Sequence, residues 1–317
     1  MFQSLAIQHF RGFGKLALEG IGRVNLVVGK NNTGKTSLLE AITLLADPGT
    51  LKSLPGLFRA NAGSVDERFY RWLPRDGSIE GETVLAATAS GAGTRYVTLT
   101  RTQEANPRWP GELQRTEQIG ALHVWRSKNL GPLRLHAVSV QHQKPDAMVN
   151  AFAEAVRSPA DEEQMESLLK AVDPRIRTVR LDAVESKPFV VVDVGLSERV
   201  PLSQAGQGIY RLVAIFSELL GHKPKICFID EIENGIHYSA LPKVWAGIAE
   251  VAARLDIQVL ATTHSWECLL AAHEVFAARD TYDLRVLQLY QLGETLSGRV
   301  LDQDHIEAAI AGEIELR

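Results

Sequence analysis

The spacing of apolar residues predicts that strands and helices alternate near the start of the chain. Residues 2–10 alternate apolar and polar positions as a half-buried strand does. Residues 23–28 are almost continuously apolar, which is typical of a strand whose two faces are both covered. Residues 35–46 carry apolar side chains at helical spacing, and the Asp-Pro-Gly sequence at 47–49 is expected to end this helix.

The middle of the chain has a different pattern from its last third. Segments rich in Val, Thr and Leu at 82–102 and 121–141 predict several strands joined by turns, and residues 176–200 predict more strands. Between these regions, residues 145–172 predict a helical stretch. The last third alternates helices and strands, which implies a largely parallel sheet. The predicted helices there are 207–221, 238–254 and 303–312, and the predicted strands are 225–230, 257–262 and 284–291.

These patterns together predict an α/β protein made of two parts. A doubly wound core with a mostly parallel sheet is expected from the two ends of the chain, residues 1–50 and 181–317. An inserted lobe, residues 51–180, is expected to hold an antiparallel β subsheet and the helical stretch.

Composition narrows the class of protein without naming a function. Of the 317 residues, 45% are hydrophobic and 23% are charged, which is ordinary for a globular protein and argues against disorder. The net charge of −4 lacks the basic character of many nucleic-acid-binding proteins, although local basic patches remain open. Apolar runs are too short to span a bilayer, and the first residues do not resemble a signal peptide. Cys227 and Cys268 lie in or beside apolar segments, so we expect buried free thiols in a cytoplasmic protein.

One loop has the form of a phosphate-binding motif. Residues 29–36, Gly-Lys-Asn-Asn-Thr-Gly-Lys-Thr, match G-x-x-x-x-G-K-[ST] between a predicted strand and a predicted helix, a context that argues against a chance match. Glycines let backbone N–H groups surround phosphate oxygens, and the helix N-terminus favours an anion. Lys35 is expected to reach the β- and γ-phosphates of ATP, and the Thr36 hydroxyl to bind Mg²⁺. The expected nucleotide contacts are Gly29, Asn31, Asn32, Thr33, Gly34, Lys35, Thr36 and Ser37.

Two carboxylates end a later predicted strand. Residues 226–229 are apolar and are followed by Asp230 and Glu231. In phosphate-loop ATPases the first acid holds Mg²⁺ and the second polarises the attacking water, so we expect these roles here; a solvated acidic turn is the alternative. Glu233 is expected in a surface turn, although it could share the metal. The next predicted strand leads to His264, where a γ-phosphate sensor is needed, because ligands gather at the carboxyl ends of parallel strands.

The order of these motifs resembles that of the ABC-type ATPases. Between the phosphate loop and the acidic strand lies Leu-Ser-Gln-Ala-Gly-Gln-Gly, which is similar to a diverged ABC signature, with Ser203 and Gly206 matching its Ser and a following Gly. In that family the signature of one subunit binds the γ-phosphate held by the other. The resemblance therefore implies a head-to-tail homodimer with two ATP sites. It also implies catalytic roles for Lys35, Glu231 and His264.

Within that family the chain resembles the RecF/SMC-like branch, and in it the OLD (overcoming lysogenization defect) ATPases. Residues 7–13, Ile-Gln-His-Phe-Arg-Gly-Phe, are similar to the branch's I-x-N-F-R-x-F opening, with His9 in place of Asn. The Gly-Lys-Asn-Asn start of the phosphate loop has the branch's form, and residues 230–237 and 261–265 resemble stand-alone OLD members. The resemblance implies that Arg11 approaches the nucleotide; a capping role is the alternative.

The chain also differs from the OLD and SMC-like ATPases that it resembles. The stretch after His264 is too short for the Toprim domain of OLD nucleases, so no nuclease of its own is expected. No long heptad tract separates Lys35 from Ser203, so no SMC-like arm is expected. The glutamine that senses Mg²⁺ in this family follows a strand of the inserted lobe. Gln141 and Gln143 are both candidates for it, and an exposed loop glutamine is the alternative.

These observations lead us to expect a dimeric OLD-like ABC ATPase in DNA repair or antiviral defence. It would act on DNA or on a separate effector such as a nuclease, with no membrane partner. A non-hydrolysing scaffold that organises a partner nuclease is an alternative. A transporter subunit is weaker because the signature is not Leu-Ser-Gly-Gly-Gln, and a GTPase is not expected because Asn-Lys-x-Asp is absent. Several arginines could contact DNA phosphates or form solvated faces. They are Arg59, Arg68, Arg71, Arg75, Arg175, Arg177 and Arg180.

Overall fold

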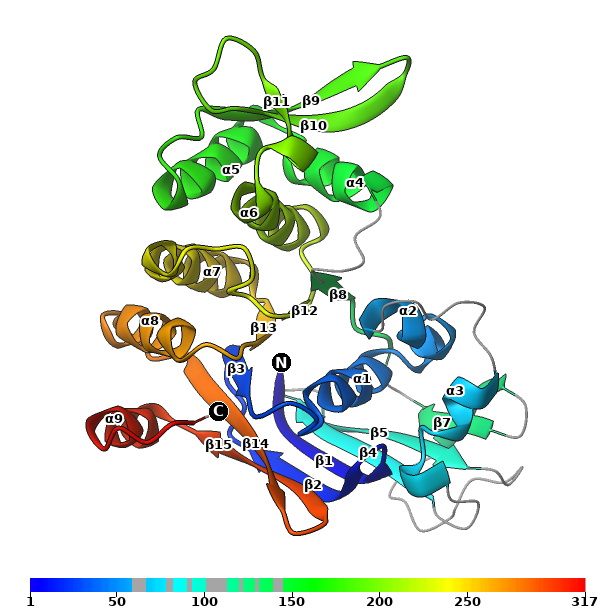
Figure 1. Cartoon of the computed structure of the whole chain (residues 1–317). Coiled ribbons are helices and arrows are strands. Elements are labelled where there is room, and N and C mark those ends of the chain that lie inside the picture. Colours follow the sequence, from blue (N-terminus) through cyan, green and yellow to red (C-terminus); the bar gives the residue numbers. More distant parts are fainter. Residues whose placement is uncertain are drawn as a thin grey trace. The chain divides into compact units, whose positions relative to one another are not determined.

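The computed structural model resolves the chain into two compact units. Unit 1 combines residues 1–135 with 285–317, and unit 2 comprises residues 136–284. Figure 1 shows the helices and strands of both units coloured along the chain. The structure describes residues 1–58, 67–77, 82–89, 93–100, 113–119, 122–128, 131–138 and 145–316.

Unit 1 contains a six-stranded antiparallel sheet. Its strands are β1 (Phe2–Phe10), β2 (Phe13–Glu19), β4 (Thr83–Ala89), β5 (Gly93–Thr100), β6 (Leu113–Ile119) and β7 (Leu122–Ser127). They follow the order β2-β1-β4-β5-β7-β6. The register places Ile7 opposite Leu16 on one side and Leu85 on the other, and all three are buried. The alternation of β1 therefore gives the sheet one apolar face, as the sequence predicts.

A second group of elements in unit 1 carries the phosphate loop. It consists of β3 (Val24–Val28), α1 (Lys35–Ala46), β14 (Leu284–Leu292), β15 (Thr295–Leu301) and α9 (Gln303–Ala311). All of β3 is buried, as expected for a strand covered on both faces. β14 lies between β3 and β15, and forms an antiparallel hairpin with β15. The Asp47 carboxylate accepts from Gly49 N at 2.9 Å just after α1, so the predicted helix end is confirmed. Shorter helices are η1 (Pro48–Lys52), α2 (Leu54–Phe58), α3 (Glu67–Arg71) and η2 (Arg75–Gly77).

Unit 2 is built around two parallel strands and a neighbour. These are β12 (Ile226–Ile229), β13 (Gln258–Thr262) and β8 (Leu135–Val138). β12 and β13 are parallel, with Ile229 opposite Ala261, and every residue of both is buried. β8 lies beside β12, where Asp230 N donates to Val138 O at 3.0 Å. The carboxyl ends of β12 and β13 consequently share one edge of the sheet.

Helices and a small antiparallel sheet complete unit 2. These elements are α4 (Pro145–Ala155), α5 (Pro159–Val172), β9 (Thr178–Val184), β10 (Lys187–Asp193), β11 (Val200–Pro201), η3 (Leu202–Gln204), α6 (Gln207–Ser217), the π-helical turn η4 (Glu218–His222), η5 (Tyr238–Ala240), α7 (Leu241–Leu255) and α8 (Trp266–Ala277). β10 pairs with both β9 and β11. Helix α6 contacts α4 and α5, and α7 contacts α5 and α8. Figure 1 shows α4 and α5 beside the β9–β11 sheet.

Most predicted elements are present, and one clear difference has a local cause. The helical stretch predicted at 145–172 consists of two helices. Ser158 caps the second helix, its hydroxyl accepting from Asp161 N at 3.2 Å, and Pro159 follows at a position that suits the first turn. Strands β2 and β15 and helix α8 were not predicted. Helix α8 has a recognisable start, because the Ser265 hydroxyl accepts from Cys268 N at 3.0 Å.

The two compact units have different boundaries from the predicted core and lobe. Compactness divides the chain after Leu135 and before Arg285. The predicted division gives a core at 1–50 and 181–317 and a lobe at 51–180. The predicted core and inserted lobe stay a prediction.

The helices of the described ranges can be compared with the length and hydropathy that a membrane-spanning helix needs. None of them is both long enough and apolar enough to cross a membrane. Even α7, with 15 residues, keeps Lys243 and Arg254 exposed.

The two cysteines are free and buried, which confirms that part of the prediction. Burial raises the pKa of Cys268 to about 12, and it also raises the pKa of Cys227. Both thiols are therefore protonated at neutral pH, the form that reacts poorly with oxidants and metals.

A buried ion pair links the turn between β1 and β2 to helix α1. Glu40 is fully buried, and Arg11 donates from Nε and Nη2 to its carboxylate oxygens at 2.8 and 3.1 Å. Arg11 also donates from Nη1 to Trp72 O at 3.2 Å, and its guanidinium lies 4.6 Å from the centre of the Phe69 ring. These contacts give Arg11 a structural role within unit 1.

Replacing Arg11 by Met should destabilise the protein strongly. Arg11→Met keeps an apolar stem but leaves Glu40 buried without its guanidinium partner, which typically costs about 3–5 kcal/mol of unfolding free energy. Urea unfolding followed by circular dichroism measures this loss. The double variant Arg11→Met/Glu40→Leu should recover much of it, because no charge is then buried. Equal stability of Arg11→Met and the parent would contradict this role.

Candidate functional site

The phosphate loop of unit 1 requires glycine at both ends. Gly29 has a φ of 150°, and a Cβ there would lie 2.4 Å from Leu289 O. Gly34 has a φ of 88°, and a Cβ there would lie 2.8 Å from Phe13 Cζ. Any larger residue would therefore be strained by its backbone conformation and would collide with its neighbours.

Side chains of the loop bond to its own carbonyl groups. Lys35 Nζ donates to Gly29 O at 2.6 Å and to Lys30 O at 3.0 Å. Thr33 is buried, and its hydroxyl donates to Lys30 O at 2.8 Å. These bonds tie the start of the loop, at Gly29 and Lys30, to Thr33 and Lys35.

The N-terminus of α1 is suited to an anion. Gly34 is its N-cap, no side chain caps the helix, and its first turn contains no acidic residue. The first N–H groups of a helix lack partners within the helix, so they can donate to phosphate oxygens. Asn32 has a φ of 64°, which asparagine tolerates better than most residues. This loop and the first turn of α1 contain all the residues that the sequence predicts to contact the phosphates, namely Gly29, Asn31, Asn32, Thr33, Gly34, Lys35, Thr36 and Ser37.

One threonine hydroxyl in unit 2 connects the two predicted catalytic acids. Thr262 Oγ1 donates to Asp230 Oδ1 at 2.7 Å and accepts from Glu231 N at 2.8 Å. Glu231 has a φ of 45°, a left-handed conformation that costs a non-glycine residue about 1–3 kcal/mol. Strained residues fixed by hydrogen bonds cluster at functional sites, which supports a functional role for this strand end.

Arg211 on α6 places a positive charge beside these acids. It is 4% exposed, and Nη2 donates to Asp230 O and, at 3.4 Å, to Glu231 O. Burial lowers the pKa of Arg211 to about 10, while the charges of Asp230, Glu231 and Glu233 act to raise it. Arg211 therefore stays positively charged at neutral pH and partly balances the three carboxylates.

Glu233 positions the segment that carries His264. Glu233 Oε1 accepts from His264 N at 2.8 Å. Its other carboxylate oxygen is buried and has no hydrogen-bond partner among the described residues. The predicted turn is present at residues 231–235, but Glu233 is only half-exposed there, because its carboxylate is oriented inward by this tertiary hydrogen bond.

The Ser–Gly segment lies at the exposed N-terminus of α6. Ser203 and Gly206 are exposed, and Gly206 is the N-cap, without a side-chain cap on the helix. A Cβ on Gly208 would lie 2.7 Å from Gly235 O, so the start of α6 packs directly against the loop that follows Glu231. The segment can thus offer N–H groups outward while contacting the acidic loop of its own unit.

The predicted site residues fall into two groups. The phosphate loop belongs to unit 1, whereas the acids, His264 and the Ser–Gly segment belong to unit 2. Their convergence on one nucleotide stays a prediction. Gln141 and Gln143 lie outside the described residues. Arg11 is engaged by Glu40, and its predicted approach to the nucleotide also stays a prediction.

Several arginines considered for DNA contact have acidic partners. Arg175 lies 2.7 Å from an Asp173 oxygen, and Arg180 lies 3.4 Å from a Glu162 oxygen. Such exposed pairs contribute little to stability, and both arginines keep accessible charge. Outside the described residues lie Arg59 and the side chain of Arg68.

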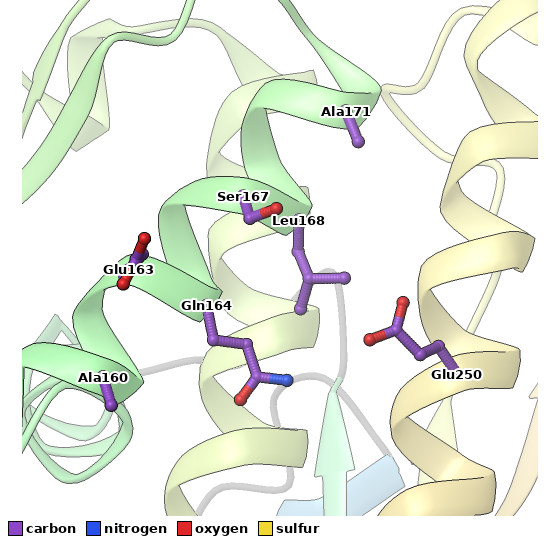
Figure 2. Close-up of a pocket in the computed structure, with 7 residues that line it drawn as sticks. All are labelled: Ala160, Glu163, Gln164, Ser167, Leu168, Ala171 and Glu250. Atoms are coloured by element: carbon purple, nitrogen blue, oxygen red, sulfur yellow. The ribbon is translucent and has the colours of Figure 1, made fainter.

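A cavity of about 370 Å³ between α5 and α7 is separate from the predicted site residues. Figure 2 shows Gln164 and Leu168 on α5 pointing toward Glu250 on α7, and Glu163 on α5 also lines the cavity. Its two carboxylates are unsuited to a triphosphate, and no residue predicted to bind nucleotide lines it.

Comparison with known proteins identifies the family. The family model described as "AAA domain, putative AbiEii toxin, Type IV TA system" matches residues 24–120 and 141–270, so the chain belongs to this family of ATPase domains. A Helicobacter pylori protein named ATP/GTP phosphatase is 22% identical over 333 residues, covering 88% of this chain and 90% of that protein. RecF of Idiomarina loihiensis, a DNA replication and repair protein, is 44% identical over 57 residues, but these cover only 18% of this chain and 16% of RecF.

Solved structures show the fold class. The SMC head bound to the C-winged helix domain of ScpA has a TM-score of 0.61 at 12% identity, covering 98% of this chain and 99% of that chain. The SMC head domain from Thermotoga maritima has a TM-score of 0.51 at 15% identity, covering 95% and 98%. The chain thus has an SMC-head-like α/β ATPase fold. The predicted resemblance to RecF/SMC-like ABC-type ATPases is confirmed.

Sequence reasoning named Glu233 but missed its positioning role, and it assigned no role to Thr262 or Arg211. Thr262 bridges the acids, Arg211 holds their carbonyl groups, and Glu233 orients the backbone at His264. A Thr at the end of a buried strand was a usable signal for Thr262. An Arg inside the apolar face of a helix was a usable signal for Arg211.

Removing the Thr262 hydroxyl should slow hydrolysis more than it weakens binding. Thr262→Val keeps the shape but frees Asp230 and Glu231 from their shared partner, at about 1–3 kcal/mol of stability. Misplacing catalytic groups can cost as much as roughly 100-fold in kcat. Steady-state ATPase assays and nucleotide titrations separate the two effects.

Thr43→Val is the matched control for this substitution. Thr43 is equally buried, but its hydroxyl donates only to Leu39 O of its own helix, at 2.8 Å. This variant should retain kcat. If both variants lost activity equally, the bridging role of Thr262 would be wrong.

Proposed function

We propose that this protein hydrolyses ATP with Mg²⁺ in a head-to-tail homodimer and uses the cycle in a DNA-linked defence or repair process. In this proposal Lys35 binds the β- and γ-phosphates, Thr36 and Asp230 hold Mg²⁺, and Glu231 activates water. His264 senses the γ-phosphate, and Gln141 senses the metal. The observation that carries the proposal is the Thr262 bridge, which fixes both acids at a strand end.

Two features of the units support the chemistry. In unit 1, the glycines and uncapped helix start suit a triphosphate. In unit 2, Arg211 and Thr262 hold the two acids in place. The Asp230 carboxylate accepts a hydrogen bond from the Thr262 hydroxyl, whereas Glu231 donates to that hydroxyl from its backbone N–H. This difference suits a metal ligand beside a general base. The name of the H. pylori relative, ATP/GTP phosphatase, supports hydrolysis and makes GTP a second nucleotide to assay.

The exposed Ser–Gly segment supports the proposed dimer. Ser203 and Gly206 face solvent at a helix N-terminus, as a group that binds another subunit's γ-phosphate must. ATP would thereby close the dimer, and hydrolysis would reopen it.

The proposals of a DNA-linked role and of a separate effector rest on similarity to related proteins and on the family description. The local similarity to RecF and the SMC-head fold favour a DNA-linked process over membrane transport. The family description names a putative toxin of a toxin–antitoxin system, which favours defence. We infer an OLD-like ATPase that works in the cytoplasm and passes its conformational change to DNA or to a partner such as a nuclease.

Two substitutions in the predicted site should separate binding from turnover. Lys35→Ala should weaken ATP binding by about 1.5–3 kcal/mol, or roughly 10- to 150-fold in Kd, because a charged donor is lost. Glu231→Gln should bind ATP normally and slow kcat about 100- to 10,000-fold, because the general base is lost. Fluorescent-nucleotide titration and phosphate release measure these effects, and DNA should stimulate the parent. Normal ATP affinity in Lys35→Ala would refute the phosphate-loop assignment.

Mixing two inactive variants tests the composite sites. Lys35→Ala disables the phosphate loop, and Ser203→Arg disables the Ser–Gly segment. A dimer with one of each retains one intact site. An equal mixture should therefore regain about a quarter of the parent rate, because half of randomly paired dimers are mixed. No regain, with dimers present by light scattering, would show that each site is complete within one chain.

A further inference from the structure

A histidine–carboxylate cluster lies in unit 2, apart from the predicted nucleotide residues. His136 on β8 and His222 on η4 both direct Nδ1 at Glu218 Oε2, at 3.1 and 2.8 Å. The ligand atoms of the three residues all lie within 4.8 Å of one another. The two imidazoles are stacked, with ring centres 4.1 Å apart.

The surroundings hold the three groups in place. The Glu218 side chain is 8% exposed, whereas those of His136 and His222 are 32% and 29% exposed. Glu218 and His222 are four residues apart on η4, and π-helical turns of this kind occur often at functional sites. A Cβ on Gly221 would lie 2.5 Å from Ala151 O, so α4 packs tightly against this turn.

We propose that His136, Glu218 and His222 form a binding site for a divalent transition metal such as Zn²⁺. Two imidazole nitrogens and one carboxylate oxygen are ligands that zinc prefers, whereas Mg²⁺ prefers oxygen ligands. Zinc bonds of about 2.0–2.2 Å set tetrahedral ligand atoms roughly 3.3 Å apart. The two distances from an imidazole Nδ1 to Glu218 Oε2, 3.1 and 2.8 Å, are close to this spacing. Coordination needs the rings to splay from their stacked arrangement, and their exposed edges leave room for this. Water would complete the coordination.

A bound metal would link β8 to the η4 turn more firmly than the hydrogen bonds do. Each Nδ1 would carry a lone pair toward the ion, with the ring proton on Nε2. The buried Glu218 carboxylate would then bind a dication instead of contacting only the two imidazole rings. The bound ion would fasten β8 to the turn at the end of α6, two elements whose ligands are 82 residues apart in the chain.

Zinc titration of the full chain, freed of any affinity tag, tests this site. The protein is stripped with a chelator and titrated calorimetrically with Zn²⁺, without nucleotide and with excess Mg²⁺ to fill oxygen-only sites. The parent should bind one Zn²⁺ per chain, and Co²⁺ should give visible bands of tetrahedral coordination. His136→Asn and His222→Asn should each weaken Zn²⁺ binding by more than roughly 100-fold. Loss of a residue that only hydrogen-bonds to a metal ligand typically costs roughly 10- to 100-fold, and loss of a ligand itself should cost more.

His305→Asn is the matched control. His305 Nδ1 also lies near a carboxylate, 2.5 Å from Asp302 Oδ1, but on the surface and in unit 1. This variant should bind Zn²⁺ as the parent does. Zinc should raise the melting temperature of the parent and of His305→Asn, but not that of His136→Asn or His222→Asn. Unchanged zinc binding in both cluster variants, or a parent that binds no zinc and shows no cobalt bands, would overturn the site.

Discussion

The hydroxyl of Thr262 is the interaction on which the acidic half of the site depends. It joins the ends of two buried parallel strands by donating to the Asp230 carboxylate and accepting from the Glu231 backbone. Glu231 adopts a left-handed conformation, which needs such support to persist. Arg211, buried beside the same strand end, supplies positive charge where three carboxylates gather. Orientation and charge balance are thus built in before any ligand arrives, as preorganised sites require.

The phosphate loop depends on a different constraint, which is space. The backbone of β14 approaches Gly29, and the ring of Phe13 approaches Gly34, so both positions exclude a side chain. Behind the loop, the buried Arg11–Glu40 pair ties α1 to the turn between β1 and β2. The Phe-Arg opening of the chain therefore has a structural use, independent of any contact between Arg11 and nucleotide. The same helix presents an uncapped N-terminus at one end and this ion pair on its side.

The family match and the fold both identify an ATPase domain. The family match covers the phosphate loop, the acidic strand and the segment reaching His264. The SMC-head fold extends over almost the whole chain, although its sequence identity is only 12%. Such low identity is expected where packing preserves a fold and only a few site residues preserve chemistry. The His136–Glu218–His222 cluster is separate from the predicted nucleotide residues, and the metal site proposed there is one that the ATPase chemistry does not require.

The phosphate loop, the acidic strand end and most strands and helices could be predicted from the amino-acid sequence. These features are written in contiguous residues, because glycine spacing, apolar runs and turn residues act locally. Strands β2 and β15 and helix α8 escaped prediction, since short amphipathic segments carry weak signals. Three contacts became visible only in the folded chain. Thr262 bridges the acids, the Glu233 carboxylate accepts from the backbone of His264, and His136 contacts a carboxylate 82 residues away. Such contacts depend on how distant strands and helices pack, and no local pattern records that packing.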